Sequence, residues 1–386
     1  MVVAPSAQSV VRGAALVLLL DMYCVGSSSV AIGTEMLNLL EHRLDVFWVN
    51  GGTLTPMGSV NAGDVKALNS YVGNAFVFKY KGVEQRRVVV RSTASWYVLE
   101  DDRSKERYPT LWRSAVEKTQ FESEYLEKNG RLWFGYWPKS PPKLHMWNVS
   151  GTSIRGRRQP IQVGESWFVE NAEDGVPFKQ ELTVMSTSPK VLLAKDLISH
   201  EVADEITRLA KSHMKRSTTG TGSDKRKDFT RTSTQMFIPR HVGIVKELYA
   251  NISKLLKIDK RTIMRQSEDL QVVHYSVGQF YRAHHDWGKD KVTRFVTVLL
   301  YLNDQASATA GGETYFAKAN GGAELKVHPG KGSAVIFYNL LEDGSACDNS
   351  MHAALPVVEG EKYVCNVWVR DYQDVTIPAL MHQEEL

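Results

Sequence analysis

Two histidines and one aspartate have the residue types and the spacing of a metal site. His284 and Asp286 stand two residues apart in the segment 281–286, and His352 follows much later in the chain. If 281–286 is a strand, its side chains alternate, so His284 and Asp286 project together while His285 projects the other way. Two imidazoles and one carboxylate leave coordination positions open, which is typical of non-haem Fe(II) centres. The pattern therefore predicts that His284, Asp286 and His352 bind Fe(II), with neutral imidazoles and an ionised carboxylate.

Further motifs surround these residues in a characteristic order. The set comprises an apolar stretch at 270–281, a second at 294–303, and then Gly311-Gly312-Glu313-Thr314, Ser350-Met351-His352, Lys362 and Trp368. This ordered set resembles the prolyl 4-hydroxylases, a branch of the 2-oxoglutarate- and Fe(II)-dependent dioxygenases. The likeness runs from Ser188-Pro189 to about Tyr372, roughly half of the chain.

The resemblance implies a fold and a reaction. The expected fold is mainly β with flanking helices, an α+β arrangement, with a catalytic double-stranded β-helix (jelly roll) over 189–375. The implied enzyme consumes O2 and 2-oxoglutarate, releases succinate and CO2, and hydroxylates peptidyl proline to 4-hydroxyproline. Its substrate would be a proline-containing peptide or protein, and L-ascorbate would restore iron oxidised in uncoupled turnovers.

The resemblance also assigns residues to the co-substrate. Lys362, in Gly360-Glu361-Lys362, would pair with the far carboxylate of 2-oxoglutarate, although without the likeness a surface lysine would be the simpler interpretation. Arg294 is the alternative cation. Tyr275 resembles the tyrosine that supports this carboxylate. Thr297 is expected in the pocket wall, and Trp368 matches a pocket tryptophan, although an ordinary core position is an equally good reading.

A polar, glycine-rich and basic segment at 215–231 is expected to be either a solvated loop or a substrate lid, and we favour the lid. Its Arg231-Thr232-Ser233 matches the Arg-Thr-Ser of the mobile loop in the resembled family. Arg231 and Tyr281 are therefore predicted to bind the peptide. His274 has the right parity to share the His284 face, but the family motif places no ligand there, so we expect a supporting or core role.

The three cysteines, Cys24, Cys347 and Cys365, form neither a disulfide scaffold nor a zinc motif. Whether Cys347 and Cys365 pair is left open by the sequence. Members of the resembled family commonly have a cysteine shortly after the distal histidine, where this chain has Leu355. Disulfides cannot therefore be transferred from relatives.

The segment 36–105 has the pattern of a small β-sandwich. Short apolar runs alternate with glycine and asparagine turns, and Asn50-Gly51-Gly52 is a hairpin signal. The residues 47–50 and 69–78 resemble the β domain of the von Hippel–Lindau protein. This domain could recruit a protein partner. The following region, 106–188, is expected to be an irregular linker, with a helix near 117–128.

The chain ends indicate targeting. Arg12, an apolar run at 14–20 and Ser29-Val30-Ala31 fit a signal peptide over 1–31, although Asp21 interrupts the pattern and an uncleaved start is the alternative. No longer apolar run follows, so no transmembrane domain is expected. The tail 376–386 ends loosely like a retrieval signal, which predicts the endoplasmic reticulum lumen. Asn148 and Asn251 begin glycosylation sequons.

Three functions compete at this level. The first is a peptidyl-proline 4-hydroxylase, the second a related oxygenase acting on another residue or a small molecule, and the third a binding protein with an inert oxygenase domain. The complete ligand set argues against the third. The small net charge of +4 supports no nucleic-acid partner.

Overall fold

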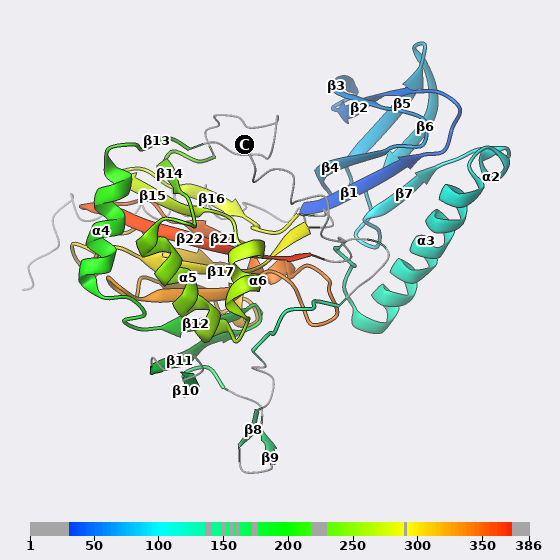
Figure 1. Ribbon diagram of the computed structural model, residues 1–386. Helices are drawn as coiled ribbons and strands as arrows, with labels where there is room; N and C mark the ends of the chain where they lie inside the picture. Colours follow the sequence, from blue (N-terminus) through cyan, green and yellow to red (C-terminus); the bar gives the residue numbers. More distant parts are fainter. Residues whose placement is uncertain are drawn as a thin grey trace, which may run out of the picture. The chain divides into compact units, whose positions relative to one another are not determined.

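The computed structural model describes residues 31–135, 137, 141–147, 152–154, 157–159, 162–171, 177–217, 230–288 and 292–372. The predicted signal segment, the retrieval-like tail and the Asn148 sequon lie outside these residues. The chain divides into two compact units, Ser27–Pro138 and Lys139–Leu386 together with Met1–Gly26 (Figure 1). Each unit is described by itself. Among the described residues, no helix is both long enough and apolar enough to cross a membrane.

The first unit is a β-sandwich. Its sheets have the strand orders β4-β1-β7 and β3-β2-β5-β6. The strands are β1 (Ala31–Asn38), β2 (Leu44–Asn50), β3 (Thr53–Val60), β4 (Val65–Tyr71), β5 (Ala75–Tyr80), β6 (Val83–Val89) and β7 (Trp96–Leu99). Alternate residues of both sheets meet in one core, which includes Met36, Val46 and Phe78. The hairpin predicted at Asn50-Gly51-Gly52 joins β2 to β3 and is confirmed.

The expectation of an irregular linker over 106–188 is wrong for Pro109–Asn129, Ser166–Asn171 and Phe178–Thr187, which form a helix and two strands. After the short α2 (Ser104–Arg107), α3 runs over Pro109–Asn129, and Ala115 on it packs against Leu37 and Leu39. Lys118 of α3 reaches Glu35 of β1 at 2.8 Å. The helix was expected only near 117–128, because its apolar positions are sparse and its buried face is partly charged.

The second unit contains a nine-stranded sheet and a four-stranded sheet. The large sheet has the order β10-β11-β12-β20-β17-β22-β15-β14-β13, and the small one β16-β21-β18-β19. The strands of the large sheet are β10 (Ser166–Asn171), β11 (Phe178–Thr187), β12 (Lys190–Ala194), β13 (Lys215–Arg216), β14 (Thr234–Ile238), β15 (Leu270–Ser276), β17 (Val292–Tyr301), β20 (Ala334–Tyr338) and β22 (Glu361–Tyr372). Those of the small sheet are β16 (Tyr281–His284), β18 (Thr314–Phe316), β19 (Leu325–Val327) and β21 (His352–Ala354). A separate pair, β8 (Thr152–Ile154) and β9 (Arg157–Gln159), completes the strands.

The inner core lies between these two sheets. Val273, Leu299 and Phe337 of the large sheet pack with Phe316 and Val327 of the small one. Residues of the opposite parity, such as Val272, Val298 and Ile336, are also fully buried. They point to the other face of the large sheet, where α4 (His200–Lys211), α5 (Gly243–Leu256) and α6 (Lys260–Gln266) contact it (Figure 1). The predicted mainly β jelly roll with flanking helices is confirmed.

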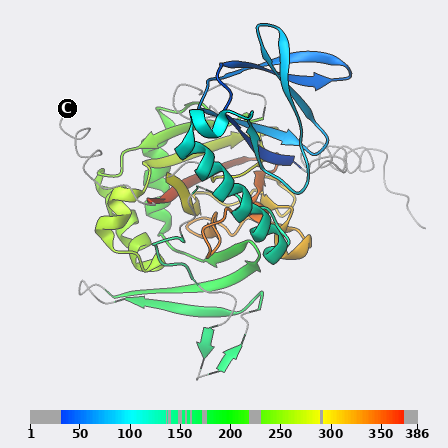
Figure 2. The ribbon, with the colours of Figure 1, turned by 90° about the vertical axis from the view of Figure 1, so that its right-hand side faces the viewer.

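Local sequence signals explain how the helices begin. The side chain of Ser199 accepts a hydrogen bond from the Val202 amide and caps α4, as its residue type predicts. The apolar spacing of Val245, Leu248 and Ile252 predicts a helix over 242–256, and this helix is α5. The hairpin of β10 and β11 extends the large sheet beyond β12 (Figure 2), so it belongs to the second unit, although the sequence placed it in the linker.

Candidate metal and co-substrate site

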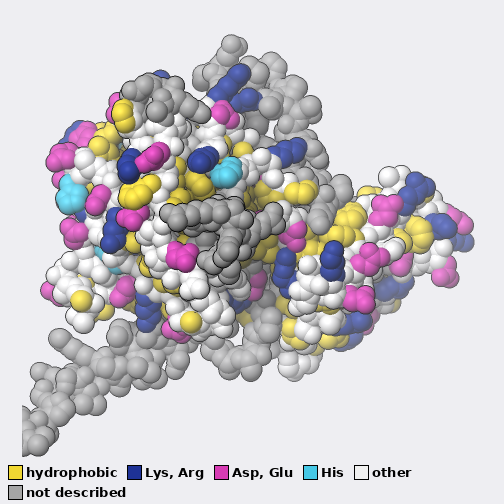
Figure 3. Space-filling view, turned by 90° about the horizontal axis from the view of Figure 1, so that it is seen from below, with side chains coloured by type: hydrophobic (Ala, Val, Ile, Leu, Met, Phe, Trp, Pro, Cys, Tyr) yellow, Lys and Arg dark blue, Asp and Glu magenta, His cyan; other side chains and the backbone are white. Residues whose placement is uncertain are grey.

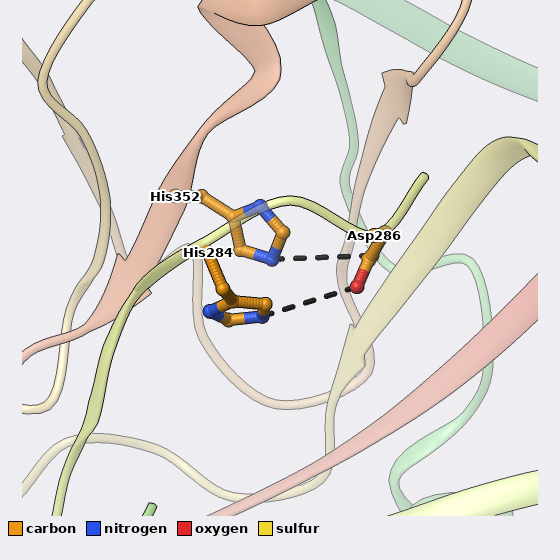
Figure 4. Close-up of side chains that lie close together, drawn as sticks. All are labelled: His284, Asp286 and His352. Atoms are coloured by element: carbon orange, nitrogen blue, oxygen red, sulfur yellow. Dashed lines mark ion pairs between the residues drawn. The ribbon is translucent and has the colours of Figure 1, made fainter. Parts of the chain in front are cut away.

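His284, Asp286 and His352 converge on one point. Their ligand atoms lie within 4.8 Å of one another, and the two Nε2 atoms are each 3.9 Å from a carboxylate oxygen of Asp286 (Figure 4). The strand register explains the meeting, because His284 of β16 is paired directly with His352 of β21. Strand β16 ends at His284. Asp286 therefore reaches the cluster from the bend after the strand and not by the expected strand parity.

Backbone carbonyls fix both imidazoles in one tautomer. Nδ1 of His284 donates to the carbonyl of Arg282 at 2.8 Å, and Nδ1 of His352 donates to the carbonyl of Ser350 at 3.0 Å. The proton is thereby held on Nδ1 in each ring. The lone pair of each Nε2 is left for a metal ion.

The electrostatics of the cluster suit a divalent cation. Burial lowers the pKa of His284 well below its usual value, and the neighbouring His352 lowers it further. Burial also lowers the pKa of His352. Burial by itself would raise the pKa of Asp286, but His352, Arg294, His284 and the Trp368 indole hold it below its usual range. Two neutral imidazoles and one carboxylate are the protonation states that metal ligation requires.

Thr297 and Trp368 both donate to Asp286. The Thr297 hydroxyl lies 2.7 Å from Oδ2 of Asp286, and the indole nitrogen of Trp368 lies 3.0 Å from the same oxygen. The two residues are paired across β17 and β22, so their side chains emerge together. Both were expected to bind the co-substrate. In the structure both polar groups donate to Asp286, and the Thr297 hydroxyl also accepts a hydrogen bond from the side-chain amide of Asn339.

Arg294 also faces this carboxylate. Its guanidinium forms two hydrogen bonds with Glu268, at 2.6 and 2.9 Å, and lies 3.4 Å from the centroid of the Trp368 ring. Its Nη1 is 3.7 Å from Oδ1 of Asp286. Because Glu268 and Asp286 already neutralise Arg294, it is poorly suited to be the alternative cation for a co-substrate.

Lys362 lies among buried hydroxyl-bearing side chains. The residue is 2% exposed, and its amino group donates to Thr314 at 3.3 Å. Tyr275 is paired with it across β15 and β22, and the Tyr301 hydroxyl donates to Thr314 at 2.6 Å. Burial lowers the pKa of Lys362 to about 7. No carboxylate of the described chain forms an ion pair with it, and a buried ammonium of this kind is suited to an anionic ligand.

Two residues beside Lys362 were not predicted from the sequence. Thr314 stands in the Gly311-Gly312-Glu313-Thr314 motif, yet it was given no role, and Tyr301 was read only as part of a strand. The glycines mark the place: a Cβ on Gly311 would lie 2.3 Å from the carbonyl oxygen of Pro356, and Gly311 has φ +72°. The close backbone approach at this motif was the signal that could have indicated Thr314.

Arg231 and Tyr281 form a stack on the metal cluster. The Tyr281 ring stacks on His284 with centroids 3.6 Å apart, and the Arg231 guanidinium lies 4.8 Å from the Tyr281 ring centroid. Arg231 is buried, and its Nε donates to Ser233. The structure thus brings both predicted substrate residues to the site. Residues 218–229, most of the expected lid, lie outside the described residues.

Other histidines and the cysteines lie apart from the metal ligands. His285 is not among the ligand candidates, as expected, and its Nε2 lies 3.0 Å from the carbonyl oxygen of Asp348. His274 pairs with Glu361 and stacks on Tyr363, so the parity it shares with His284 does not bring it to the metal ligands. A turn separates β15 from β16, and parity does not carry across it. Cys347 and Cys365 are both buried, and no disulfide joins them, which answers the pairing question for the described cysteines.

Comparisons with known proteins agree with this site. Residues 270–370 match the family model of the 2OG-Fe(II) oxygenase superfamily. Prolyl 4-hydroxylase 5 of Arabidopsis thaliana is 33% identical over 212 residues, 48% of this chain and 69% of its own length. Prolyl 4-hydroxylase 1 of the same plant is 32% identical over 205 residues, 48% of this chain and 71% of its own. A solved viral collagen prolyl hydroxylase of Paramecium Bursaria Chlorella virus-1, in complex with 2OG, is 25% identical, with a TM-score of 0.38 over 47% of this chain and 95% of its own.

The matched region contains all three metal-ligand candidates and Lys362, and its donor set fits Fe(II). The similarities to the plant enzymes cover more than two thirds of each relative. This chain therefore belongs to the prolyl 4-hydroxylases, and it is a 2-oxoglutarate- and Fe(II)-dependent dioxygenase.

Proposed function

We propose that this enzyme hydroxylates peptidyl proline at C4. The observation that carries the proposal is the placement of an unpaired buried cation, Lys362, in the same inter-sheet core as the cluster of His284, Asp286 and His352. Lys362 supplies a partner for one end of a dicarboxylate. The cluster of His284, Asp286 and His352 supplies a metal site with open coordination positions. Family membership supplies the substrate class.

Each group has a role that follows from its contacts. His284, Asp286 and His352 would hold the iron through two Nε2 atoms and one carboxylate oxygen. Lys362 and Thr314 would bind the far carboxylate of 2-oxoglutarate, with Tyr275 beside them. Arg231 and Tyr281 would contact the peptide at the His284 side of the cluster. Because proline has no amide hydrogen, an enzyme that holds it must supply donors to the peptide carbonyls.

The bound iron supplies the oxidative chemistry, in which decarboxylation of 2-oxoglutarate to succinate and CO2 accompanies insertion of one oxygen atom of O2 into the C–H bond. The chain orients both substrates and excludes water from the site. L-Ascorbate is the proposed reductant for turnovers that leave the iron oxidised.

Mass spectrometry of proline-rich peptides tests this proposal. The full chain, supplied with Fe(II), 2-oxoglutarate and ascorbate, should add one oxygen to proline and release one succinate for each hydroxylation. His352→Ala should abolish both products. His285→Ala is the matched control, because this neighbouring histidine binds the Asp348 carbonyl instead of the cluster. Succinate release driven by a different substrate would identify another oxygenase activity, and product formation by His352→Ala would refute the metal site.

We also propose that the enzyme works in the endoplasmic reticulum lumen, as a glycoprotein after removal of its signal segment. Support comes from the apolar N-terminal run and the retrieval-like tail. Strand β1 begins at Ala31, so cleavage there would leave almost the whole strand. The second sequon is a less favourable glycosylation site, because Asn251 lies within α5 and Ser253 is buried. N-terminal sequencing of protein expressed in secretory cells tests entry, and a chain that still begins at Met1 with bare Asn148 would contradict it.

On the face drawn in Figure 3, basic and acidic side chains are interspersed, in keeping with the small net charge. For the first unit we propose a von Hippel–Lindau-like fold that serves chiefly as a structural module. Contact with a protein partner is the alternative role.

A further inference from the structure

Asn339 stands at the end of a hydrogen-bond chain that leads to the metal cluster. It follows β20 directly and is fully buried. Its backbone is fixed on both sides, by an amide donated to Phe295 at 2.8 Å and by the Cys347 amide at 2.9 Å. Its side-chain Nδ2 donates to the Thr297 hydroxyl at 2.9 Å, and that hydroxyl donates to Oδ2 of Asp286 at 2.7 Å.

The direction of this chain is determined by the number of protons. A threonine hydroxyl has one proton, and an ionised carboxylate can only accept. If Asn339 donates to the Thr297 oxygen, the single Thr297 proton is committed to Asp286. With the amide reversed, Asn339 and Asp286 would compete for that proton. The arrangement in the structure lets both hydrogen bonds form at once.

The two oxygens of Asp286 consequently differ. Oδ2 accepts from Thr297 and from Trp368, which occupies both of its lone-pair directions. Oδ1 has no such donor among the described residues within hydrogen-bond distance, with Arg294 at 3.7 Å. Oδ1 is thus the oxygen available to a cation. A carboxylate that binds through one oxygen occupies one coordination position and leaves the others for co-substrates.

We infer that Asn339 is a positioning residue of the metal site: acting through Thr297, it keeps Asp286 a ligand through Oδ1 alone. A further observation separates this role from simple packing. The side-chain oxygen of Asn339 is buried and has no hydrogen-bond partner in the described chain. A buried acceptor without a donor destabilises the fold. Asn339 therefore places an amide donor opposite Thr297 although its own oxygen is left unsatisfied.

Titration of Co(II) into the anaerobic metal-free full chain tests the inference, followed by the visible absorption of the bound ion. Thr297→Val, which keeps the shape and removes the hydroxyl, should weaken Co(II) binding about 10- to 100-fold. Its absorption spectrum should change because Oδ2 becomes available to the ion. Thr297→Ser is the matched control that retains the hydroxyl. Asn339→Leu should weaken binding about 2- to 12-fold, the effect of one hydrogen bond.

The double variant decides how Asn339 acts. In the Thr297→Val background, Asn339→Leu should change Co(II) affinity by no more than about twofold, because the hydrogen bond from Asn339 to Thr297 is already absent. Metal-free Asn339→Leu should melt no lower than the parent protein, since an unsatisfied acceptor is removed. If Asn339→Leu is poorly folded, the smaller Asn339→Ala takes its place in the same cycle.

Each failure has its own meaning. Equal losses of Co(II) affinity from Asn339→Leu in both backgrounds, or no loss in either, would show that Asn339 does not act through Thr297. The inference rests on the proposed metal site, and that site fails separately if His352→Ala binds Co(II) as tightly as the parent protein.

Discussion

Among the described residues, each of the two units contains one buried lysine, and the two lysines have opposite surroundings. Lys118 of the first unit lies 2.8 Å from Glu35 and 3.8 Å from Glu122, and its amino group is 3.8 Å from the Trp96 ring centroid. Lys362 of the second unit is at least as buried, but its hydrogen-bond partner is the Thr314 hydroxyl. A buried cation neutralised by carboxylates of its own chain is part of an internal ion-pair network, and removing it alone destabilises the fold. A buried cation that lacks them provides a place for an anionic ligand.

The largest effect on stability is expected from Lys118→Met. The substitution removes the positive charge that faces Glu35 and Glu122 and so breaks a buried ion pair, at a cost of about 3–5 kcal/mol in the free energy of unfolding. Urea denaturation of the full chain measures it, followed by fluorescence. The KM for 2-oxoglutarate of the folded fraction should not change. An unaltered unfolding transition would show that the network contributes nothing to the first unit.

Lys362→Met should weaken co-substrate binding without destabilising the fold, the reverse of what is expected for Lys118→Met. Loss of a charged hydrogen bond to the far carboxylate costs about 1.5–3 kcal/mol, so the KM for 2-oxoglutarate should rise about 10- to 150-fold. The fold should be no less stable, because an unneutralised buried charge has been removed. Succinate-release kinetics and a melting curve of the same preparation test both statements. A KM equal to that of the parent protein would exclude Lys362 as the partner of the co-substrate.

The pH dependence of co-substrate binding sharpens the contrast. Burial lowers the pKa of Lys362 to about 7, so the free enzyme has a charged lysine below that pH and an increasingly neutral one above it. Only the charged form pairs with a carboxylate, so binding above pH 7 must take up a proton. The affinity for 2-oxoglutarate should fall by up to about tenfold per pH unit from 7 upward. Calorimetry in two buffers of different ionisation enthalpy counts the proton.

Lys362→Arg is the control for that experiment. A guanidinium stays protonated throughout this range, so the slope above pH 7 should disappear if the lysine causes it. An affinity that rises with pH in the parent protein would mean that another titrating group dominates.

The smallest effect is expected for peptide binding by the first unit, which should bind hydroxyproline no more tightly than proline. If the proposed von Hippel–Lindau-like fold of this unit holds, Trp48 and Ser70 would match two residues of that protein's hydroxyproline pocket, and Met57, Asn74 and Phe76 would stand at its other positions. Asn74 donates to the Ser70 hydroxyl at 3.1 Å, and Phe76 is buried in the sandwich core. A buried prolyl hydroxyl without a partner would cost about 1–3 kcal/mol.

Matched proline and hydroxyproline peptides should therefore bind this unit without preference for the hydroxylated one. The titration uses the full chain in the inactive His352→Ala background, because a fragment ending at 105 would lack α3. A tenfold preference for the hydroxylated peptide would instead make the unit a reader of the enzyme's product.

The sequence by itself determined the metal-ligand candidates, the lysine proposed for the co-substrate and the fold class. His284 and Asp286 are close in the chain, and a family motif surrounds them, so local order was enough. The amphipathic helix at 242–256 and the Asn50-Gly51-Gly52 hairpin were likewise local signals, because the groups that interact there are a few residues apart.

Only the tertiary structure decided which side chains form hydrogen bonds around the ligand candidates and which carboxylate pairs with the buried lysine of the first unit. The donation of Thr297 and Trp368 to Asp286, the contact of Asn339 with Thr297, and the pairing of Lys118 with Glu35 all join residues far apart in sequence. Such contacts depend on strand register, in which a shift of one residue turns every side chain to the opposite face. Register is set by the whole sheet and by the packing of its core, which no local pattern in one strand specifies.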